Sequence, residues 1–144
     1  MSASESGRIR AGVVGAGHMG QYHILALAEL WDVDLVAVCD TDTERGNQVA
    51  AQYGTRAVAS HRDLAGLVDI ATVAVPTERH FEVTRDLLEA GVHVLVEKPM
   101  TPTLEEAKEL FRVARQRGRV LHGGKVERFN GAVQELRKIV EQPI

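Results

Sequence analysis

The stretch GVVGAGHMGQYH, Gly12–His23, decides the fold of this chain. It contains the pattern G-x-G-x-x-G at Gly15, Gly17 and Gly20, between a run typical of a strand and a run typical of a helix. The first glycine allows a tight turn, the second lets the backbone approach a pyrophosphate, and the third lets helix and strand pack closely. The pattern predicts a phosphate cradle at a helix start, where amides and the helix dipole favour an anion. A glycine turn that binds nothing is the alternative.

Residues near the glycines complete a candidate dinucleotide site. His18 and Met19 lie at the helix start, between the second and third glycines. Asp40 comes twenty residues after Gly20, at the end of the next predicted strand. A carboxylate there accepts hydrogen bonds from the adenosine ribose and repels a 2'-phosphate, which favours NAD over NADP. Arg45, one helical turn further, is either a ligand for a 2'-phosphate or a solvated arginine, so NADP stays possible.

Apolar runs and helical periods alternate along the chain. Strands are expected in residues 9–14, 34–40, 55–58, 68–75, 92–97 and 119–124, and helices in 18–30, 41–54, 60–67, 78–90, 103–118 and about 129–140. Strands that alternate with long helices pair in parallel through right-handed crossovers. The predicted fold class is therefore α/β: a doubly wound parallel sheet (Rossmann fold) of about six strands, in the order 3-2-1-4-5-6, with helices on both faces.

Helical spacing and capping patterns predict which residues face the core and where helices begin and end. The predicted inward faces are Met19, Tyr22, Ala26 and Leu30; Val83, Leu87 and Ala90; Leu104, Ala107, Phe111 and Ala114; and Phe129, Val133, Leu136 and Val140. The predicted start pairs are Thr41 with Glu44, Ser60 with Asp63, and Thr103 with Glu106, and the predicted stops are Gly54, Gly91 and Gly118.

Composition excludes several classes of protein. The 144 residues suit one domain, and the net charge of −3 gives no footprint for nucleic acid. No apolar run approaches the ~18 residues of a membrane span, so we expect a cytoplasmic protein.

The one cysteine, Cys39, is interpreted as a buried strand residue. The six histidines show no i,i+4 pair, so no metal is assigned. Residues 1–8 are expected to be a disordered leader and 9–144 the domain.

Two further stretches follow the fourth and fifth predicted strands: VAVPTERHFE at 73–82 and VLVEKPMTPTLEEAKEL at 94–110. With the glycine pattern, they resemble the N-terminal domain of the glucose-fructose oxidoreductase, inositol dehydrogenase and MocA family of sugar and cyclitol oxidoreductases. The resemblance covers about residues 9–140. Its most specific part is Glu97-Lys98-Pro99, at a strand end where open α/β sheets bind ligands.

The resemblance implies that Lys98 is the catalytic lysine, which reaches between nicotinamide and substrate. Its cation would stabilise the alkoxide that develops as hydride leaves the carbinol carbon. Glu97 is expected to orient the ammonium and Pro99 to fix the backbone. A surface lysine followed by a helix-entry proline is the alternative. The sequence leaves open whether the bond before Pro99 is cis.

Pro76, Thr77 and His80 match the family's segment that lines the cofactor. Thr77 also suits the N-cap of the next helix, and His80 equally suits a solvated residue of its first turn.

The stretch GGKVERFNGAV at 123–133 resembles family members that oxidise the 3-hydroxyl of UDP-N-acetylglucosamine or related nucleotide sugars. Arg128 matches that pattern, whereas Lys125 and Gly131 depart from it, because those members usually carry histidine and proline there. Arg128 is interpreted as a contact to cofactor or substrate phosphate, or as a helix-start arginine.

The resemblance also implies a second α/β domain with the sugar pocket, a partner acid or base and the main homo-oligomer interface, absent from these 144 residues. The sequence thus predicts the nucleotide-binding domain of an NAD(P)-dependent oxidoreductase that moves a hydride between a sugar, nucleotide-sugar or cyclitol hydroxyl and nicotinamide. Alone, the chain is expected to bind cofactor with little or no turnover. The alternative is a free-standing NAD(H)-binding sensor, which would have no use for Glu97-Lys98-Pro99.

Overall fold

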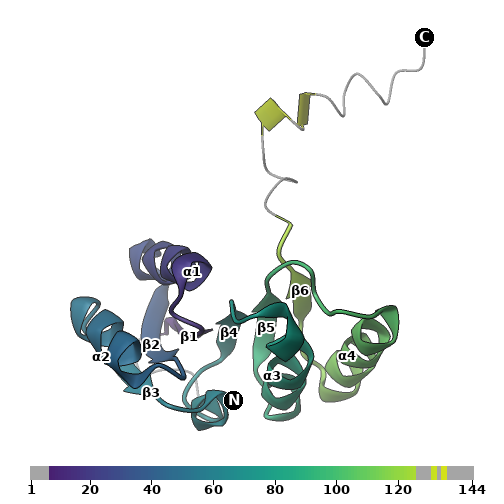
Figure 1. The fold of residues 1–144 in the computed structure, drawn as a ribbon, viewed down its shortest axis with the longest axis horizontal. Helices are drawn as coiled ribbons and strands as arrows, with labels where there is room; N and C mark the ends of the chain where they lie inside the picture. The colour runs from purple at the N-terminus through teal and green to yellow at the C-terminus, as the bar shows by residue number, and fades with distance from the viewer. Residues whose placement is uncertain (1–6, 126–130, 133, 136–144) are drawn as a thin grey trace.

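The computed structural model describes residues 7–125, 131–132 and 134–135. Within them, six parallel strands form one sheet in the order β3-β2-β1-β4-β5-β6, as predicted (Figure 1). The strands are β1 (Ile9–Val14), β2 (Val33–Cys39), β3 (Arg56–Val58), β4 (Ile70–Val73), β5 (His93–Val96) and β6 (Leu121–Gly123). The helices are α1 (His18–Glu29), α2 (Thr43–Gln52), the 3-10 helix η1 (His61–Leu64), α3 (Thr77–Glu89) and α4 (Leu104–Arg117).

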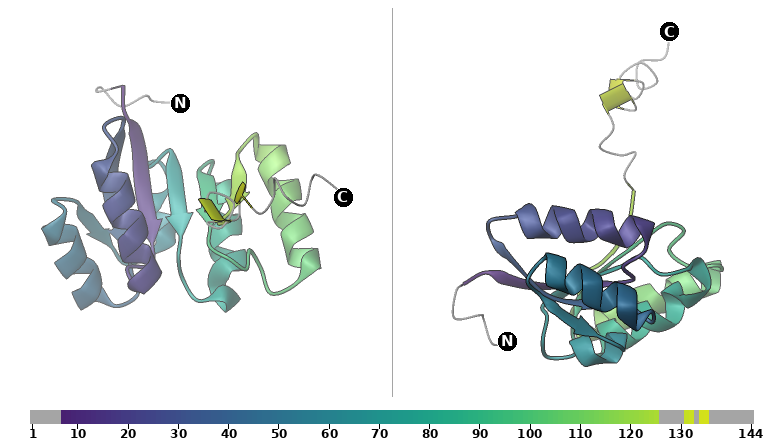
Figure 2. Two further views of the ribbon diagram at one scale, coloured as in Figure 1. Left: turned by 90° about the horizontal axis from the view of Figure 1, so that it is seen from above. Right: turned by 60° about the vertical axis from the view of Figure 1, so that its left-hand side comes forward.

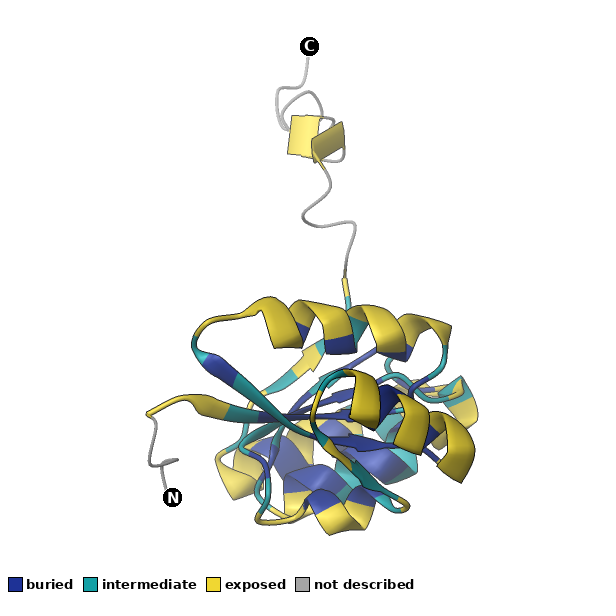
Figure 3. Cartoon of the chain, turned by 90° about the vertical axis from the view of Figure 1, so that its left-hand side faces the viewer, coloured by how far each residue is buried: buried dark blue, intermediate teal, exposed yellow. Residues whose placement is uncertain are grey.

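Helices cover both faces of the sheet, which confirms the doubly wound arrangement (Figure 2). Ile24 and Leu27 of α1 pack with Val49 of α2 in the apolar cluster of one face. Leu87 of α3 and Leu110 of α4 belong to the cluster of the other face. The strands are therefore buried between two layers, with the exposed residues on the outer helix surfaces (Figure 3).

The inward face predicted for α1 is wrong. Ile24 and Leu27 are buried, while all four predicted residues are exposed: Met19, Tyr22, Ala26 and Leu30. The cause is Gly20, where a Cβ would come within 1.7 Å of the Gly15 carbonyl oxygen. This close approach turns Gly20 toward the strand, and residues four and seven positions later then face the sheet.

The inward face predicted for α3 is confirmed at Val83 and Leu87, but Ala90 lies past the last helical residue and is exposed. The inward face predicted for α4, which starts at Leu104, is only partly correct. The buried face of the helix is rotated from it and packs toward α3. Of the predicted residues, Ala114 is buried and Ala107 is half-buried, whereas Leu104 and Phe111 are exposed. Leu110 and Val113 complete the buried face.

Two capping boxes and three helix ends are confirmed. The backbone after α2, α3 and α4 has positive φ at the predicted glycines, 63° at Gly54, 84° at Gly91 and 61° at Gly118. The capping boxes join Ser60 with Asp63 at η1 and Thr103 with Glu106 at α4.

Two predicted helix starts are wrong. Asp42, not Thr41, caps α2, because its carboxylate accepts a hydrogen bond from the Arg45 amide. Pro76 stands at the cap position of α3, and Thr77 is the first helical residue.

None of the helices in the described ranges is long and apolar enough to cross a membrane. The same ranges hold no group of three His, Cys, Asp or Glu side chains placed to bind a metal ion. Outside them lie Arg128 and the predicted helix stripe of Phe129, Val133, Leu136 and Val140.

Candidate functional site

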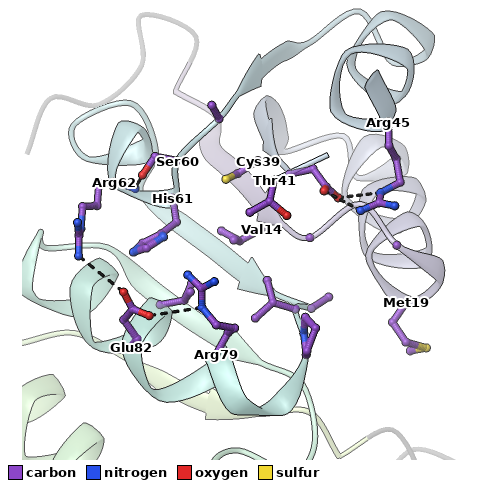
Figure 4. A pocket seen from close by; sticks show the side chains of 18 residues that line it. Val14, Met19, Cys39, Thr41, Arg45, Ser60, His61, Arg62, Arg79 and Glu82 are labelled. Atoms are coloured by element: carbon purple, nitrogen blue, oxygen red, sulfur yellow. Dashed lines mark hydrogen bonds and ion pairs between the residues drawn. The ribbon is translucent and has the colours of Figure 1, made fainter. Parts of the chain in front are cut away.

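A cleft of about 650 Å³ opens where β1, β2, β3 and β4 end. Because the strands are parallel, the loops that follow them meet at one edge of the sheet, and strand order reverses between β1 and β4. Figure 4 shows Met19 and Arg45 on one side of the cleft and Arg62, Glu82 and Arg79 on the other.

The glycine loop forms one wall of the cleft and fits a dinucleotide. Gly15 has φ of 93°, and a Cβ there would come within 2.6 Å of the Ala74 carbonyl oxygen. Gly17, in contrast, faces open space, with no atom within 4 Å of a Cβ position. Gly17 also precedes α1 and makes no side-chain cap, so the first amides of the helix are available to an anion. The backbone thus leaves room where a pyrophosphate would need to approach.

Asp40 lies at the back of the cleft, 6% exposed. Its carboxylate accepts hydrogen bonds from the Ala16 amide at 2.7 Å and the Asp42 amide at 2.8 Å. Arg45 donates two more, from Nε at 3.0 Å and Nη2 at 2.7 Å. Burial alone would raise the pKa of Asp40, but the Arg45 and amide hydrogen bonds outweigh it and hold the pKa below its usual value. Asp40 is therefore ionised at neutral pH.

Arg45 is an exposed arginine on the face of α2, as one of the two interpretations expected, but its guanidinium also forks onto Asp40, which the sequence did not predict. Its side chain is nevertheless 43% exposed, and it also lies 3.3 Å from the Asp42 carboxylate. The pairing raises the pKa of Arg45 above its ordinary value.

Cys39 lines the cleft beside Asp40 and is 3% exposed, as expected for a strand residue. Burial and the nearby negative charges raise the pKa of its thiol to about 11. The thiol therefore stays protonated at neutral pH and is a poor nucleophile.

A separate set of contacts fixes the turn that carries Lys98. Glu97, 7% exposed, accepts a hydrogen bond from the Lys98 amide at 3.2 Å, and its other oxygen lies 2.8 Å from Nε2 of His23 in α1. The Lys98-Pro99 peptide bond is cis. A Cβ on Gly124 would come within 3.3 Å of the Glu97 oxygens. Glu97 thus holds the backbone of Lys98 and the ring of His23, and in the described residues no ion pair joins it to the Lys98 ammonium, contrary to expectation.

His80 fixes the other side of the same turn. Its ring is 1% exposed, with Nδ1 2.7 Å from the Pro99 carbonyl oxygen and Nε2 2.9 Å from the Val75 carbonyl oxygen. The alternative that His80 is a solvated first-turn residue is therefore wrong. Since Val75 lines the cleft, His80 connects the cleft to the Lys98 turn.

The structure brings only part of the predicted set together. The predicted residues that line the cleft are Gly15, Gly17, Met19, Asp40, Arg45 and Pro76. The predicted residues outside its lining are His18, Gly20, Thr77, His80, Glu97 and Lys98. Gly20 lies against the Gly15 backbone, and Lys98 is exposed at the carboxyl end of β5.

Sequence reasoning missed His23 as a site residue. It lies three residues after Gly20, in the stretch that predicted the cradle, but its partner Glu97 is 74 residues away. One signal was available in the sequence: His23 is a polar residue one turn after Gly20, and Gly20 is the residue at which α1 is expected to pack closely against the sheet.

Comparisons with known proteins agree with this geometry. The family model described as "Oxidoreductase family, NAD-binding Rossmann fold", of the Gfo/Idh/MocA group, matches residues 9–125. UDP-N-acetylglucosamine 3-dehydrogenase from Acidithiobacillus ferrooxidans is 39% identical over 130 residues, 90% of this chain and 41% of that protein. D-glucoside 3-dehydrogenase from Escherichia coli K12 is 36% identical over 143 residues, 96% of this chain and 41% of that protein.

Solved structures of relatives share the fold. The Acidithiobacillus ferrooxidans enzyme superposes with a TM-score of 0.85 over 92% of this chain and 43% of its own. The WlbA dehydrogenase from Bordetella pertussis, solved with NADH and UDP-GlcNAcA, gives a TM-score of 0.88 at 31% identity, over 94% of this chain and 42% of its own.

The chain therefore spans about two fifths of the length of these relatives. The glycine cradle, the acid at the end of β2 and the matched family model agree on one conclusion. The chain belongs to the Gfo/Idh/MocA oxidoreductase family, as its NAD-binding Rossmann domain.

Proposed function

We propose that this chain is the cofactor-binding half of an oxidoreductase that transfers a hydride between NAD and a hydroxyl-bearing carbon of a sugar, nucleotide sugar or cyclitol. The observation that carries the proposal is the fixed turn at Glu97-Lys98-Pro99. It lies at the same sheet edge as the glycine cradle. The residues on either side of Lys98 are held in place, because Glu97 contacts His23 and the Pro99 carbonyl contacts His80. The relatives named above support the substrate class, because two of them carry the name of a sugar or nucleotide-sugar dehydrogenase.

Each residue has a distinct task in this reaction. Gly15 and Gly17 leave room for the pyrophosphate, and Asp40 is the acceptor for the ribose hydroxyls. A bound nicotinamide supplies the site that accepts or gives the hydride. Lys98 places a cation beside the substrate oxygen, where it stabilises the negative charge that develops when the hydroxyl proton leaves. Glu97 positions the lysine backbone through its hydrogen bond to the amide.

The remaining components of the reaction are proposed to come from outside these 144 residues. A second domain would cover the substrate side of the nicotinamide, supply the sugar pocket and carry the oligomer interface. The share of the relatives that this chain covers, 41%, supports the second domain, because it leaves more than half of their length for it. We also propose a cytoplasmic location.

Substitution of Lys98 tests the proposal. The assay uses the whole protein encoded by the reading frame that includes this chain, with the proposed second domain. NADH formation is measured with UDP-N-acetylglucosamine, glucose and myo-inositol. The expected result is turnover of one of them, a loss of ~100-fold or more in kcat for Lys98→Met, and an unchanged Kd for NADH. Lys108→Met, on the exposed side of α4, is the control for loss of a lysine and should keep full activity. Undiminished turnover in Lys98→Met would contradict the assigned role, and NADH binding with no turnover would favour a sensor.

A further inference from the structure

We propose that Arg45 is a latch on Asp40, which must open before the adenosine ribose of a dinucleotide can bind. The proposal rests on the proposed function, because it concerns the same cleft. It also assigns Arg45 a role opposite to that of a simple cofactor ligand, because its guanidinium occupies the carboxylate that the ribose of NADH would need.

The carboxylate of Asp40 has no lone pair left for a ribose hydroxyl. A carboxylate offers about four acceptor positions. Oδ2 accepts from the Ala16 amide and Arg45 Nε, and Oδ1 accepts from the Asp42 amide and Arg45 Nη2. The side chain of Asp40 is only 3% exposed. A ribose hydroxyl can therefore donate to Asp40 only if one of these four donors leaves.

Arg45 is the donor that can leave. The Ala16 and Asp42 amides belong to the backbone around the cleft, and their movement would disturb the glycine loop or the cap of α2. The Arg45 side chain, in contrast, extends from the first turn of α2 and is 43% exposed (Figure 4). Rotation of an exposed arginine into water costs little, since an ion pair in contact with solvent contributes little to stability.

The two ligand chemistries respond to the latch in opposite ways. A ribose diol needs the carboxylate, so NADH binding includes the cost of opening the Asp40–Arg45 pair. A 2'-phosphate needs a cation, so NADPH would gain Arg45 in the open position while Asp40 still repels it. Removal of the guanidinium should strengthen NADH binding and weaken NADPH binding.

The test is a calorimetric titration of wild type, Arg45→Ala and Arg79→Ala with NADH and with NADPH. We expect Arg45→Ala to lower the Kd for NADH by ~3- to 10-fold, the affinity equivalent of a partly exposed ion pair, and to raise the Kd for NADPH. Arg79→Ala is the matched control, because Arg79 lines the same cleft but pairs with Glu82 at 3.4 Å. It removes the same charge without freeing Asp40 and should not tighten NADH binding.

A second measurement uses salt. Added salt screens the exposed guanidinium, so the difference in NADH affinity between wild type and Arg45→Ala should shrink at high ionic strength. Alanine suits the exposed helical position, and thermal melting checks that the variant is folded.

The proposal is overturned if Arg45→Ala leaves the NADH affinity unchanged or weakens it, or if Arg79→Ala tightens NADH binding equally. Either result would leave the proposed hydride transfer standing, because that function depends on Lys98 turnover. Undiminished turnover in Lys98→Met, or no turnover by the wild-type protein, together with tighter NADH binding by Arg45→Ala would overturn the proposed hydride transfer and leave the latch standing.

Discussion

The ring of His23 lies 2.8 Å from the carboxylate of Glu97, although 74 residues separate them. The contact joins α1, which begins at the glycine cradle, to the turn that carries Lys98. Both side chains are largely shielded from water, with 16% and 9% of their areas exposed. The pyrophosphate end and the proposed reacting end of the site are thus connected through one hydrogen bond.

Replacement of His23 by alanine should destabilise the domain by ~1–3 kcal/mol, because it leaves one oxygen of the buried Glu97 carboxylate without its partner. Urea unfolding measures this loss. Tyr22→Ala is the control: the neighbouring side chain is 57% exposed and should change the free energy of unfolding by less than ~0.5 kcal/mol. Equal stability of the two variants would show that the His23–Glu97 contact contributes nothing.

The glycines of the cradle should respond differently to an added methyl group. Gly20→Ala places a Cβ 1.7 Å from the Gly15 carbonyl oxygen, so α1 must move and the melting temperature should fall by several degrees or more. Gly17→Ala meets no atom within 4 Å, so the fold should persist while NADH binding weakens. Thermal melts with NADH titrations separate the two effects. A Gly17→Ala variant with wild-type NADH affinity would contradict the cradle.

His80→Ala should cost ~2–4 kcal/mol in unfolding free energy, since it leaves a cavity at a fully buried site and removes the ring's polar contacts to the Val75 and Pro99 carbonyls. Because the ring supports Val75, which lines the cleft, NADH affinity should fall as well. Denaturant unfolding and calorimetry give the two quantities. The exposed His122, replaced by alanine, serves as control, and an affinity loss confined to His80→Ala is the expected pattern.

Asp86 should contribute to stability in a pH-dependent way. Burial would raise its pKa, but hydrogen bonds from His61 and Arg62 and their charges lower it below the usual value. A lowered folded pKa gives stability that is present above the unfolded value of about 3.9 and is lost as pH falls through the folded pKa.

The Asp86→Asn variant should therefore lose stability near neutral pH and show a flatter decline between about pH 5 and 2 than wild type. Urea unfolding at a series of pH values checks this. Asp63→Asn, at an exposed capping residue, controls for the loss of one carboxylate. Parallel pH curves for wild type and Asp86→Asn would refute the assignment.

The strand order and the sheet edge that carries the site could be predicted from sequence, because both follow from alternation and from parallel pairing. The runs around Val13, Val73 and Val96 are apolar enough to indicate strands buried on both faces. The capping boxes at Ser60 and Thr103 are local patterns and were equally accessible.

Helix rotation and side-chain pairing could not be predicted in the same way. The rotation of α1 depends on the contact between Gly20 and the Gly15 carbonyl, which apolar spacing does not contain. The partner of Arg45 depends on its side-chain rotamer and on the backbone bend at Asp42. The His23–Glu97 contact requires the distance between two segments far apart in the chain, which only the assembled sheet supplies.

The chain contains one cysteine, and its thiol is buried with a pKa of about 11. Maleimide and iodoacetamide reagents attack thiolates, so Cys39 should resist them in the folded state. A cysteine introduced at an exposed residue such as Trp31, which is 85% exposed, would be the one fast-reacting thiol. The domain accepts a single fluorophore at a chosen position without prior removal of its own cysteine.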